Sequence, residues 1–192
     1  MKFSPSATVP RLSIIAKYVN MADVNSLPQF GPAATAAEKE ALLVRAVELM
    51  FFAYRDFTSE PDAILASLDF GRAHHRVLHF VDRNPGLRVA ELLEILKITK
   101  QSLSRVLNQL IDGGFIERTP GEVDRRERLL FTTPKGRDLA KRLLAPQLAL
   151  LQRALPAGDA DAERVFAFLA AMIRPEDRAR AGRRTDPRRP GK

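Results

Sequence analysis

The segment from residue 70 to 132 constrains the fold most strongly, because it contains two helical patterns with a very short turn between them. The first pattern covers 89–96 and the second 100–112, and Gly113-Gly114 follows the second as a stop signal. Two strand patterns then flank a turn-rich, highly charged stretch at 119–128. The segment therefore predicts a helix–turn–helix followed by a β-hairpin.

Further helical patterns flank this segment on both sides. Thr35 and Glu38 have the spacing of a capping box, and the helix they begin is apolar on too many sides for a single buried stripe. Such a helix needs two partners, one within its own subunit and one elsewhere. Besides the two helices of the helix–turn–helix, the expected helices cover 35–57, 61–67, 71–83, 133–155 and 160–173, with Pro61 at the start of the second and Pro146 kinking the fourth.

These patterns predict a mainly α fold with one small β-hairpin. Within it we expect Ala73, Val77, Phe80 and Val81 to form a buried stripe, and Leu129 and Phe131 to mark a half-buried strand. Three regions follow along the chain. Residues 1–34 are expected to be a flexible extension, residues 35–173 a folded domain with its functional core at 70–133, and residues 174–192 a disordered basic tail.

The positive charge is concentrated where the helix–turn–helix pattern lies. Residues 71–142 carry 15 basic and 9 acidic side chains, a net charge of +6, and the tail 174–192 adds eight Lys or Arg against three acids. An ordinary solvated surface does not require this segregation, whereas a phosphate-binding face does. The tail is expected either to add sequence-independent DNA affinity or simply to favour solubility.

The second helix of the pair has the features of a recognition helix. Leu103, Val106, Leu107 and Leu110 recur at helical spacing and must face inward. The opposite face then consists of polar side chains that can bind base edges or phosphates, with no acid before Asp112. These candidate DNA-binding residues are Lys100, Gln101, Ser102, Ser104, Arg105 and Asn108. The alternative is an ordinary amphipathic helix with a polar outer face.

The charged tip of the hairpin is a second candidate DNA contact. Arg125, Arg126 and Arg128 stand among acids, of which Asp124 and Glu127 are expected to orient the arginines towards phosphates or a minor groove. The alternative is a self-neutralising surface loop, because surface ion pairs contribute only about 0–1 kcal/mol.

Together these residues resemble the winged helix–turn–helix of the MarR family of bacterial transcriptional regulators. The most specific marks are the Asp124-Arg125-Arg126 wing and the exit from Leu129 through Phe131-Thr132 to Gly136. The resemblance covers about residues 36–173. It implies a homodimer, paired through its first helix and its last two helices, that binds a near-palindromic operator in double-stranded DNA. Arg88 departs from the family pattern, since a small hydroxyl residue often caps the helix at this point; the arginine would weaken the cap and add a possible phosphate contact.

The resemblance also implies control by a small aromatic or anionic effector. The residues expected to line such a pocket are Phe51, Phe52, Arg55, His75 and His79, although an aromatic stripe at this spacing is more often core. His75 and His79 have a spacing that can chelate a metal, so a metal- or haem-responsive regulator is an alternative. Cysteine is absent, which excludes sensing by thiol oxidation. With a third ligand lacking, we expect no metal and no cofactor.

Other function classes are less compatible with the sequence. It contains no phosphate-binding loop, nucleophile elbow or metalloprotease motif, so we expect no enzymatic activity. A winged helix that binds only proteins is the remaining alternative, against which the polar helix face and the local positive charge count. No apolar run approaches the roughly 20 residues of a membrane span, and we expect a cytoplasmic protein with no membrane partner.

Overall fold

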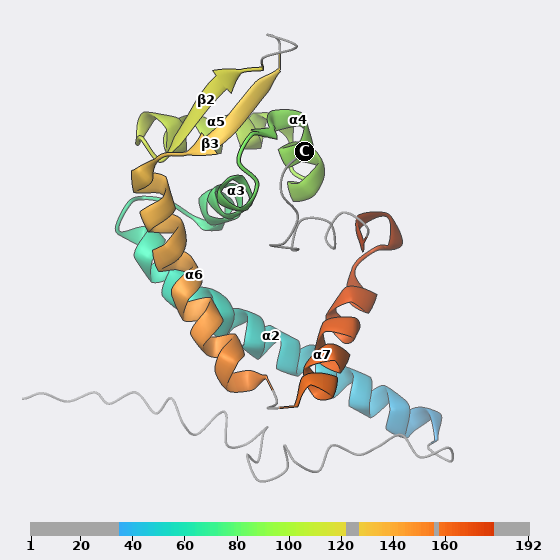
Figure 1. Ribbon diagram of the computed structural model, residues 1–192. Coiled ribbons are helices and arrows are strands. Elements are labelled where there is room, and N and C mark those ends of the chain that lie inside the picture. The colour runs from blue at the N-terminus through green and yellow to red at the C-terminus, as the bar shows by residue number, and fades with distance from the viewer. Residues whose placement is uncertain (1–34, 122–126, 156–157, 179–192) are drawn as a thin grey trace, which may run out of the picture. The chain divides into compact units, whose positions relative to one another are not determined.

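The computed structural model describes residues 35–121, 127–155 and 158–178. The chain divides into two units, residues 1–50 and 51–192. The elements are α2 (Ala36–Ala66), α3 (Arg72–Arg83), β1 (Leu87–Arg88), α4 (Val89–Leu96), α5 (Lys100–Asp112), β2 (Ile116–Pro120), β3 (Arg128–Thr132), α6 (Pro134–Ala154) and α7 (Asp159–Met172) (Figure 1). The predicted mainly α fold with a small antiparallel hairpin is confirmed. The predicted flexible extension, residues 1–34, lies outside the described residues.

Helix α2 begins where the capping box predicts, but it ends later than the predicted residue 57. The Thr35 N–H donates to the Glu38 carboxylate (2.8 Å), and the Glu38 N–H donates to Thr35 Oγ1 (3.3 Å). The predicted break near residue 57 and the separate helix 61–67 are wrong, because α2 continues through Pro61 to Ala66. Pro61 and Leu65 are both buried, so packing of this turn compensates for the hydrogen bond that proline cannot donate.

Helix α3 lies at the centre of the apolar core of the second unit. Val77 and Val81 are buried as predicted, but Phe80 is only half-buried and Ala73 is exposed. His74 and Leu78 are buried instead. His74 and Leu78 thus replace Ala73 and Phe80 in the buried stripe, and His74 can be buried because its ring nitrogens have polar partners. The α3 side chains pack with Leu92 and Leu96 of α4 and with the apolar face of α5.

The sheet has three strands in the order β1-β3-β2, and all pairs are antiparallel. Leu87 pairs with Leu130, and Ile116 pairs with Thr132. Leu130 and Thr132 face the core, whereas Leu129 and Phe131 lie on the other face and are half-buried. The sequence pattern marks Leu129 and Phe131 of this strand, whereas the side chains of β3 that are buried in the core are Leu130 and Thr132. Figure 1 shows β2 and β3 side by side with α3, α4 and α5 grouped around them.

Helix α6 begins two residues after the end of β3. Thr133 caps it, since its Oγ1 accepts the Gly136 N–H at 3.0 Å, and Pro134 takes the first helical position. The helix continues through Pro146 to Ala154. At the far end of α7, residues 175–178 of the predicted disordered tail form a helical turn, in which Arg178 donates to the carbonyls of Ala171 and Ile173. Residues 179–192 lie outside the described residues.

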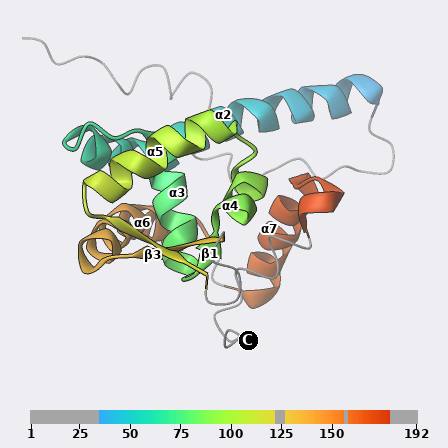
Figure 2. The ribbon, with the colours of Figure 1, turned by 90° about the horizontal axis from the view of Figure 1, so that it is seen from above.

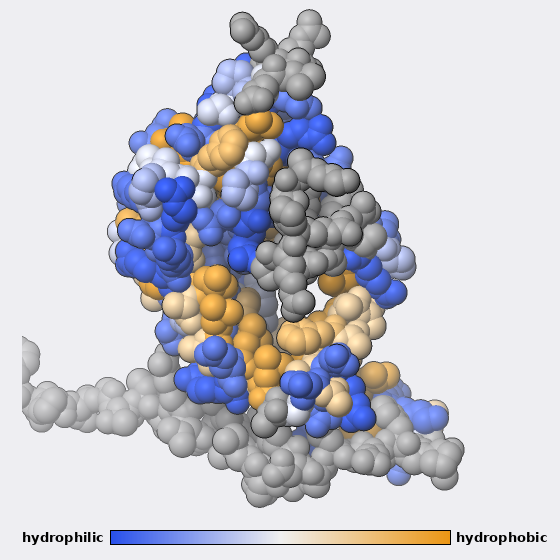
Figure 3. Space-filling view, viewed as in Figure 1, coloured by the Kyte–Doolittle hydropathy of each residue, from blue (hydrophilic) through white to orange (hydrophobic). Residues whose placement is uncertain are grey.

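Several helices leave large apolar side chains exposed. Helix α7 has no buried residue, and Phe166 remains 58% exposed. Figure 3 shows apolar side chains of α6 and α7 at the surface. Helix α2 likewise exposes Leu43, Val44 and Val47 in the first unit and Phe51 and Tyr54 in the second. Among the described residues, no helix combines the length and hydropathy needed to cross a bilayer.

Candidate nucleic-acid interface

The turn between α4 and α5 fixes the start of the recognition helix. Lys97 has a left-handed backbone (φ 53°) and donates its N–H to the carbonyl of Leu93, which ends α4. Two residues later Thr99 caps α5: its Oγ1 accepts the Ser102 N–H (3.1 Å) and donates to the Ser102 hydroxyl (2.9 Å). Residues 97–99 therefore end α4 and begin α5 within three residues, and the short turn that the sequence predicts between the two helices is confirmed.

Helix α5 separates its apolar and polar side chains onto opposite faces. Leu103, Val106, Leu107 and Leu110 are all buried, Leu110 completely. Figure 2 shows α5 lying across α3. The six predicted DNA-binding residues of this helix are all exposed, which leaves amide, hydroxyl and guanidinium groups available to a ligand. The structure therefore brings Lys100, Gln101, Ser102, Ser104, Arg105 and Asn108 together on one outward surface.

The base of the wing is described, but its tip is not. Asp124, Arg125 and Arg126 lie outside the described residues. Arg128 is exposed at the start of β3, and its Nη1 donates to the carbonyl of Glu127 at 3.1 Å. The proposed contacts of the tip arginines with DNA therefore remain predictions.

Arg88 connects the start of α4 with the base of the hairpin. Its Nη1 lies 2.9 Å from Glu127 Oε1, and its Nε lies 3.3 Å from Glu91 Oε2. The hydrogen bond to Glu127 and then that to Glu91 raise the pKa of the Arg88 guanidinium. Glu91 also accepts the Arg88 N–H that begins α4 (3.1 Å). The possible phosphate contact of Arg88 and the orientation of the wing arginines by Glu127 stay predictions.

The joint between α5, the wing and α6 was not identified from the sequence. Phe115 is buried there, and its carbonyl accepts the Thr133 N–H at 3.1 Å. Lys135 Nζ donates to the carbonyl of Gly113 (2.8 Å) and lies 4.3 Å from the centre of the Phe115 ring. Gly136 is so close to Phe115 that a Cβ at this position would overlap the Phe115 carbonyl oxygen. This joint fixes the hairpin against the C-terminal end of α5.

The three histidines of α3 occupy different environments. His74 is buried and bonded to groups on either side, whereas His75 and His79 are half-buried. Burial lowers the pKa of His75, with a smaller contribution from His79, while Asp62 opposes it. Burial and then Arg83 lower the pKa of His79. No group of three His, Asp or Glu residues within the described ranges is arranged to hold a metal ion.

Two of the predicted effector residues, Phe52 and Arg55, contact each other. The Arg55 guanidinium stacks over Phe52 (5.1 Å) and pairs with Asp56 (2.9 Å), and Phe51 is largely exposed. A pocket of about 240 Å³ lies nearby between α2 and α6. Its lining residues, which do not include the five predicted, are Asp56, Phe57, Ser59, Glu60, Pro61, Pro146, Leu150 and Arg153.

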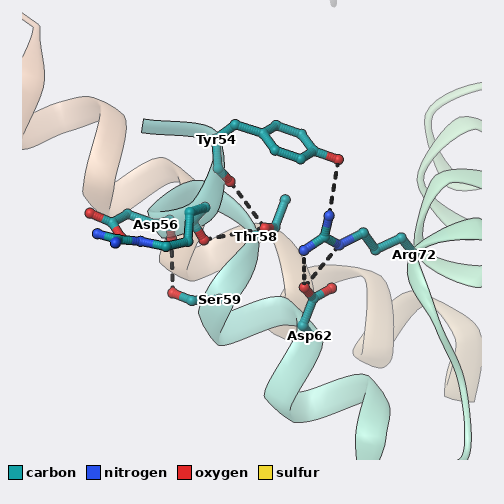
Figure 4. Close-up of polar contacts among 7 residues, drawn as sticks. Tyr54, Asp56, Thr58, Ser59, Asp62 and Arg72 are labelled. Atoms are coloured by element: carbon teal, nitrogen blue, oxygen red, sulfur yellow. Dashed lines mark hydrogen bonds and ion pairs between the residues drawn. The ribbon is translucent and has the colours of Figure 1, made fainter. Parts of the chain in front are cut away.

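A polar network connects the end of α2 to the start of α3. Arg72 donates from Nε (2.9 Å) and Nη2 (2.8 Å) to the same oxygen of Asp62, and from Nη1 to the Tyr54 hydroxyl (3.4 Å) (Figure 4). Its guanidinium also lies over the Tyr54 ring, 5.2 Å from the centre. The hydrogen bond to Asp62 is the largest cause of the raised pKa of Arg72. Sequence spacing gives no signal for this network, because its members belong to different helices.

Comparisons with known proteins agree with this architecture. Residues 68–127 match a family model described as the MarR family. The HTH-type transcriptional regulator PetP of Rhodobacter capsulatus is 47% identical over 134 residues, which cover 69% of this chain and 81% of PetP. Two solved structures share the fold: Streptococcus pneumoniae FabT in complex with DNA (TM-score 0.58, 19% identity, 68% of this chain and 92% of FabT) and an Escherichia coli MarR mutant complexed with operator DNA (TM-score 0.52, 22% identity, 69% and 96%). The chain belongs to the MarR family of winged helix–turn–helix transcriptional regulators.

Proposed function

We propose that this regulator binds a near-palindromic operator in double-stranded DNA as a homodimer, with α5 of each subunit in a major groove. The observation that carries the proposal is the outward face of α5, where six polar side chains lie opposite four buried apolar ones. Arginine can bind guanine, and asparagine or glutamine can bind adenine, through paired hydrogen bonds in the major groove. The solved FabT and MarR structures, which share this fold and contain DNA, support DNA as the partner.

The wing is proposed to add contacts that do not depend on base sequence. Arg125, Arg126 and Arg128 would neutralise phosphates, with Asp124 orienting them, on either side of the groove that α5 occupies. Phosphate contacts release counterions, so binding should weaken steeply as salt rises. The net charge of +6 on residues 71–142 supports this contribution. The site of action is proposed to be the cytoplasm, where the chain would meet DNA.

The exposed apolar helices support the homodimer. A helix such as α7, in which no residue is buried, is not stabilised by packing within its own chain. Exposed apolar patches of this kind mark interaction sites, and most soluble oligomers are symmetric assemblies of identical chains. A homodimer would cover α7 and the apolar residues of α2, and would place two recognition helices for a two-fold symmetric operator.

A small aromatic or anionic effector is proposed to tune this binding. Phe51, Phe52, Arg55, His75 and His79 supply aromatic and cationic groups suited to such a ligand. The residues come from α2 and α3, the helix on which α5 packs. A thermal-shift screen with aromatic carboxylates tests this part of the proposal, since a ligand that binds only the folded protein raises its melting temperature, and raises it further as the ligand concentration increases above Kd.

Binding-site selection followed by fluorescence anisotropy tests the main proposal. Wild-type protein should enrich a near-palindromic sequence and bind it far more tightly than a random duplex at physiological salt. Arg125→Ala or Arg126→Ala should weaken binding to both duplexes alike and reduce the slope of log K against log salt by about 1. Enrichment of no sequence, or a salt slope near zero, would contradict the proposal.

A further inference from the structure

A buried hydrogen-bonded histidine connects the core to the recognition helix. His74 on α3 is 6% exposed, and its two ring nitrogens have partners on different elements. Nδ1 accepts the N–H of Gly71 at 3.1 Å. Nε2 lies 2.9 Å from the side-chain oxygen of Gln109 on α5. With Nδ1 accepting, the neutral ring carries its proton on Nε2, which therefore donates to Gln109.

Aromatic packing holds the His74 ring in this orientation. The ring stacks on Phe70 with a centroid distance of 4.4 Å and an interplanar angle of 8°. Phe70 in turn contacts Phe115 edge to face, with the centroids 5.4 Å apart. Phe115 lies at the joint between α5 and the wing. The imidazole is thus fixed by a backbone group on one side and an aromatic stack on its face, so the direction of its N–H is set before DNA binds.

The partner residue lies at the edge of the proposed DNA-binding face. Gln109 comes one helical turn after Arg105 and directly after Asn108, so these three side chains lie on neighbouring positions of α5. The buried residues of α5 pack without directional bonds, and such packing allows small rotations of a helix about its axis. A directional hydrogen bond at the edge of the face opposes these rotations.

The rotation of α5 is important because base contacts tolerate little error. An atom about 6 Å from a helix axis moves by about 1 Å when the helix turns by about 10°. The side chains of a binding site must be held within about 0.5 Å, or about 10–20°, of the positions in which they contact the ligand. A rotation of α5 by about 10° would therefore displace the ends of Arg105 and Asn108 by more than about 0.5 Å.

We propose that His74 is a positioning residue for DNA recognition: through its hydrogen bond to Gln109 it holds α5 at the rotation that aims Arg105 and Asn108 at base edges. This inference rests on the proposed function. The inference also gives the two glutamines of α5 different roles. The side-chain oxygen of Gln109 is bonded to His74, whereas Gln101 is exposed at the start of the helix. Paired bonds from Gln109 to adenine would require that same oxygen.

A double-mutant cycle on DNA affinity tests the role of this bond. His74→Phe keeps a ring for stacking on Phe70 but removes both nitrogens, and Gln109→Met removes the acceptor at an exposed position where loss of folding is not expected. We expect each variant to bind the duplex selected with wild-type protein about tenfold more weakly, and a random duplex less than about twofold more weakly. The double variant should bind no more weakly than either single one, because both remove the same interaction.

Two further variants separate positioning from stability. His74→Gln retains an N–H donor and should recover most of the lost preference for the selected duplex. Gln147→Met alters a buried glutamine of α6, and it should change the melting temperature without changing base preference. Additive losses in the double variant, equal losses on both duplexes, or unchanged preference in His74→Phe would overturn the inference. A wild-type protein that fails to distinguish the two duplexes would instead overturn the proposed function and this inference with it.

Discussion

Replacement of Gly136 by alanine should destabilise the protein, although alanine normally stabilises a helix. Gly136 is buried in the first turn of α6, and its N–H donates to Thr133 Oγ1. A Cβ at this position would overlap the Phe115 carbonyl oxygen, which itself accepts the N–H of Thr133. Because the obstructing atom belongs to the backbone, a change of side-chain rotamer cannot relieve the contact.

The magnitude follows from two opposing effects. Replacing glycine by alanine where the backbone permits it stabilises a protein by about 0.4–1 kcal/mol, chiefly through the unfolded chain. Overpacking costs about 1–3 kcal/mol and more where relaxation is prevented. We therefore expect Gly136→Ala to lower the free energy of unfolding by about 2 kcal/mol. For a chain of this size the melting temperature should fall by about 4–8 °C.

Thermal unfolding followed by circular dichroism measures this effect. Wild type and variants are compared at one protomer concentration, because the proposed dimerisation would make the melting temperature depend on concentration. Gly71→Ala is the matched control, since a Cβ at Gly71 meets nothing within 4 Å, and its melting temperature should stay within about 2 °C of wild type. If Gly136→Ala melted at the wild-type temperature, the close packing of α6 on the wing joint would be refuted.

Three other changes have defined outcomes. Phe166→Glu should shift the protein from dimer to monomer in light scattering, because it charges the exposed apolar face of α7; an unchanged dimer would place the interface elsewhere. Acidification below about pH 6.5 should destabilise the fold, because the pKa values of His75 and His79 are lowered in the folded state and the unfolded chain therefore binds protons first. Denaturant titrations across pH should show that the double variant His75→Gln/His79→Gln loses less free energy of unfolding on acidification than wild type. An equal loss in the two proteins would exclude these histidines as the cause. Thr133→Ala should cost about 1 kcal/mol in the same titrations at neutral pH, as loss of a helix cap does, and no change would show that the cap is dispensable.

Local sequence signals were sufficient for much of this fold. The helix–turn–helix, the capping box of Thr35 and Glu38 and the polar face of α5 all depend on residues within a few positions of one another. Their chemistry is decided locally, by helical periodicity and by side chains that satisfy the ends of helices. The same signals indicated the family, which the comparisons confirm.

Tertiary contacts decided what the sequence could not. Pro61 was expected to begin a helix, but burial of its turn carries α2 through it. The core stripe of α3 includes His74 because Gln109, 35 residues later, accepts its N–H. Arg88 pairs with Glu127 across 39 residues, and local reasoning gives no signal for this ion pair. Each departure involves a partner that is distant in sequence.

The central claim is that the exposed face of α5 specifies the DNA sequence. The most direct measurement is the anisotropy of the selected duplex, and of a panel with single base-pair changes, against wild type and Arg105→Ala. Arg164→Ala, which alters an exposed arginine of α7, is the control. We predict that Arg105→Ala loses about 1–3 kcal/mol on the selected duplex and no longer discriminates at one base pair of each half-site. Wild-type affinity and base preference in Arg105→Ala would contradict the claim.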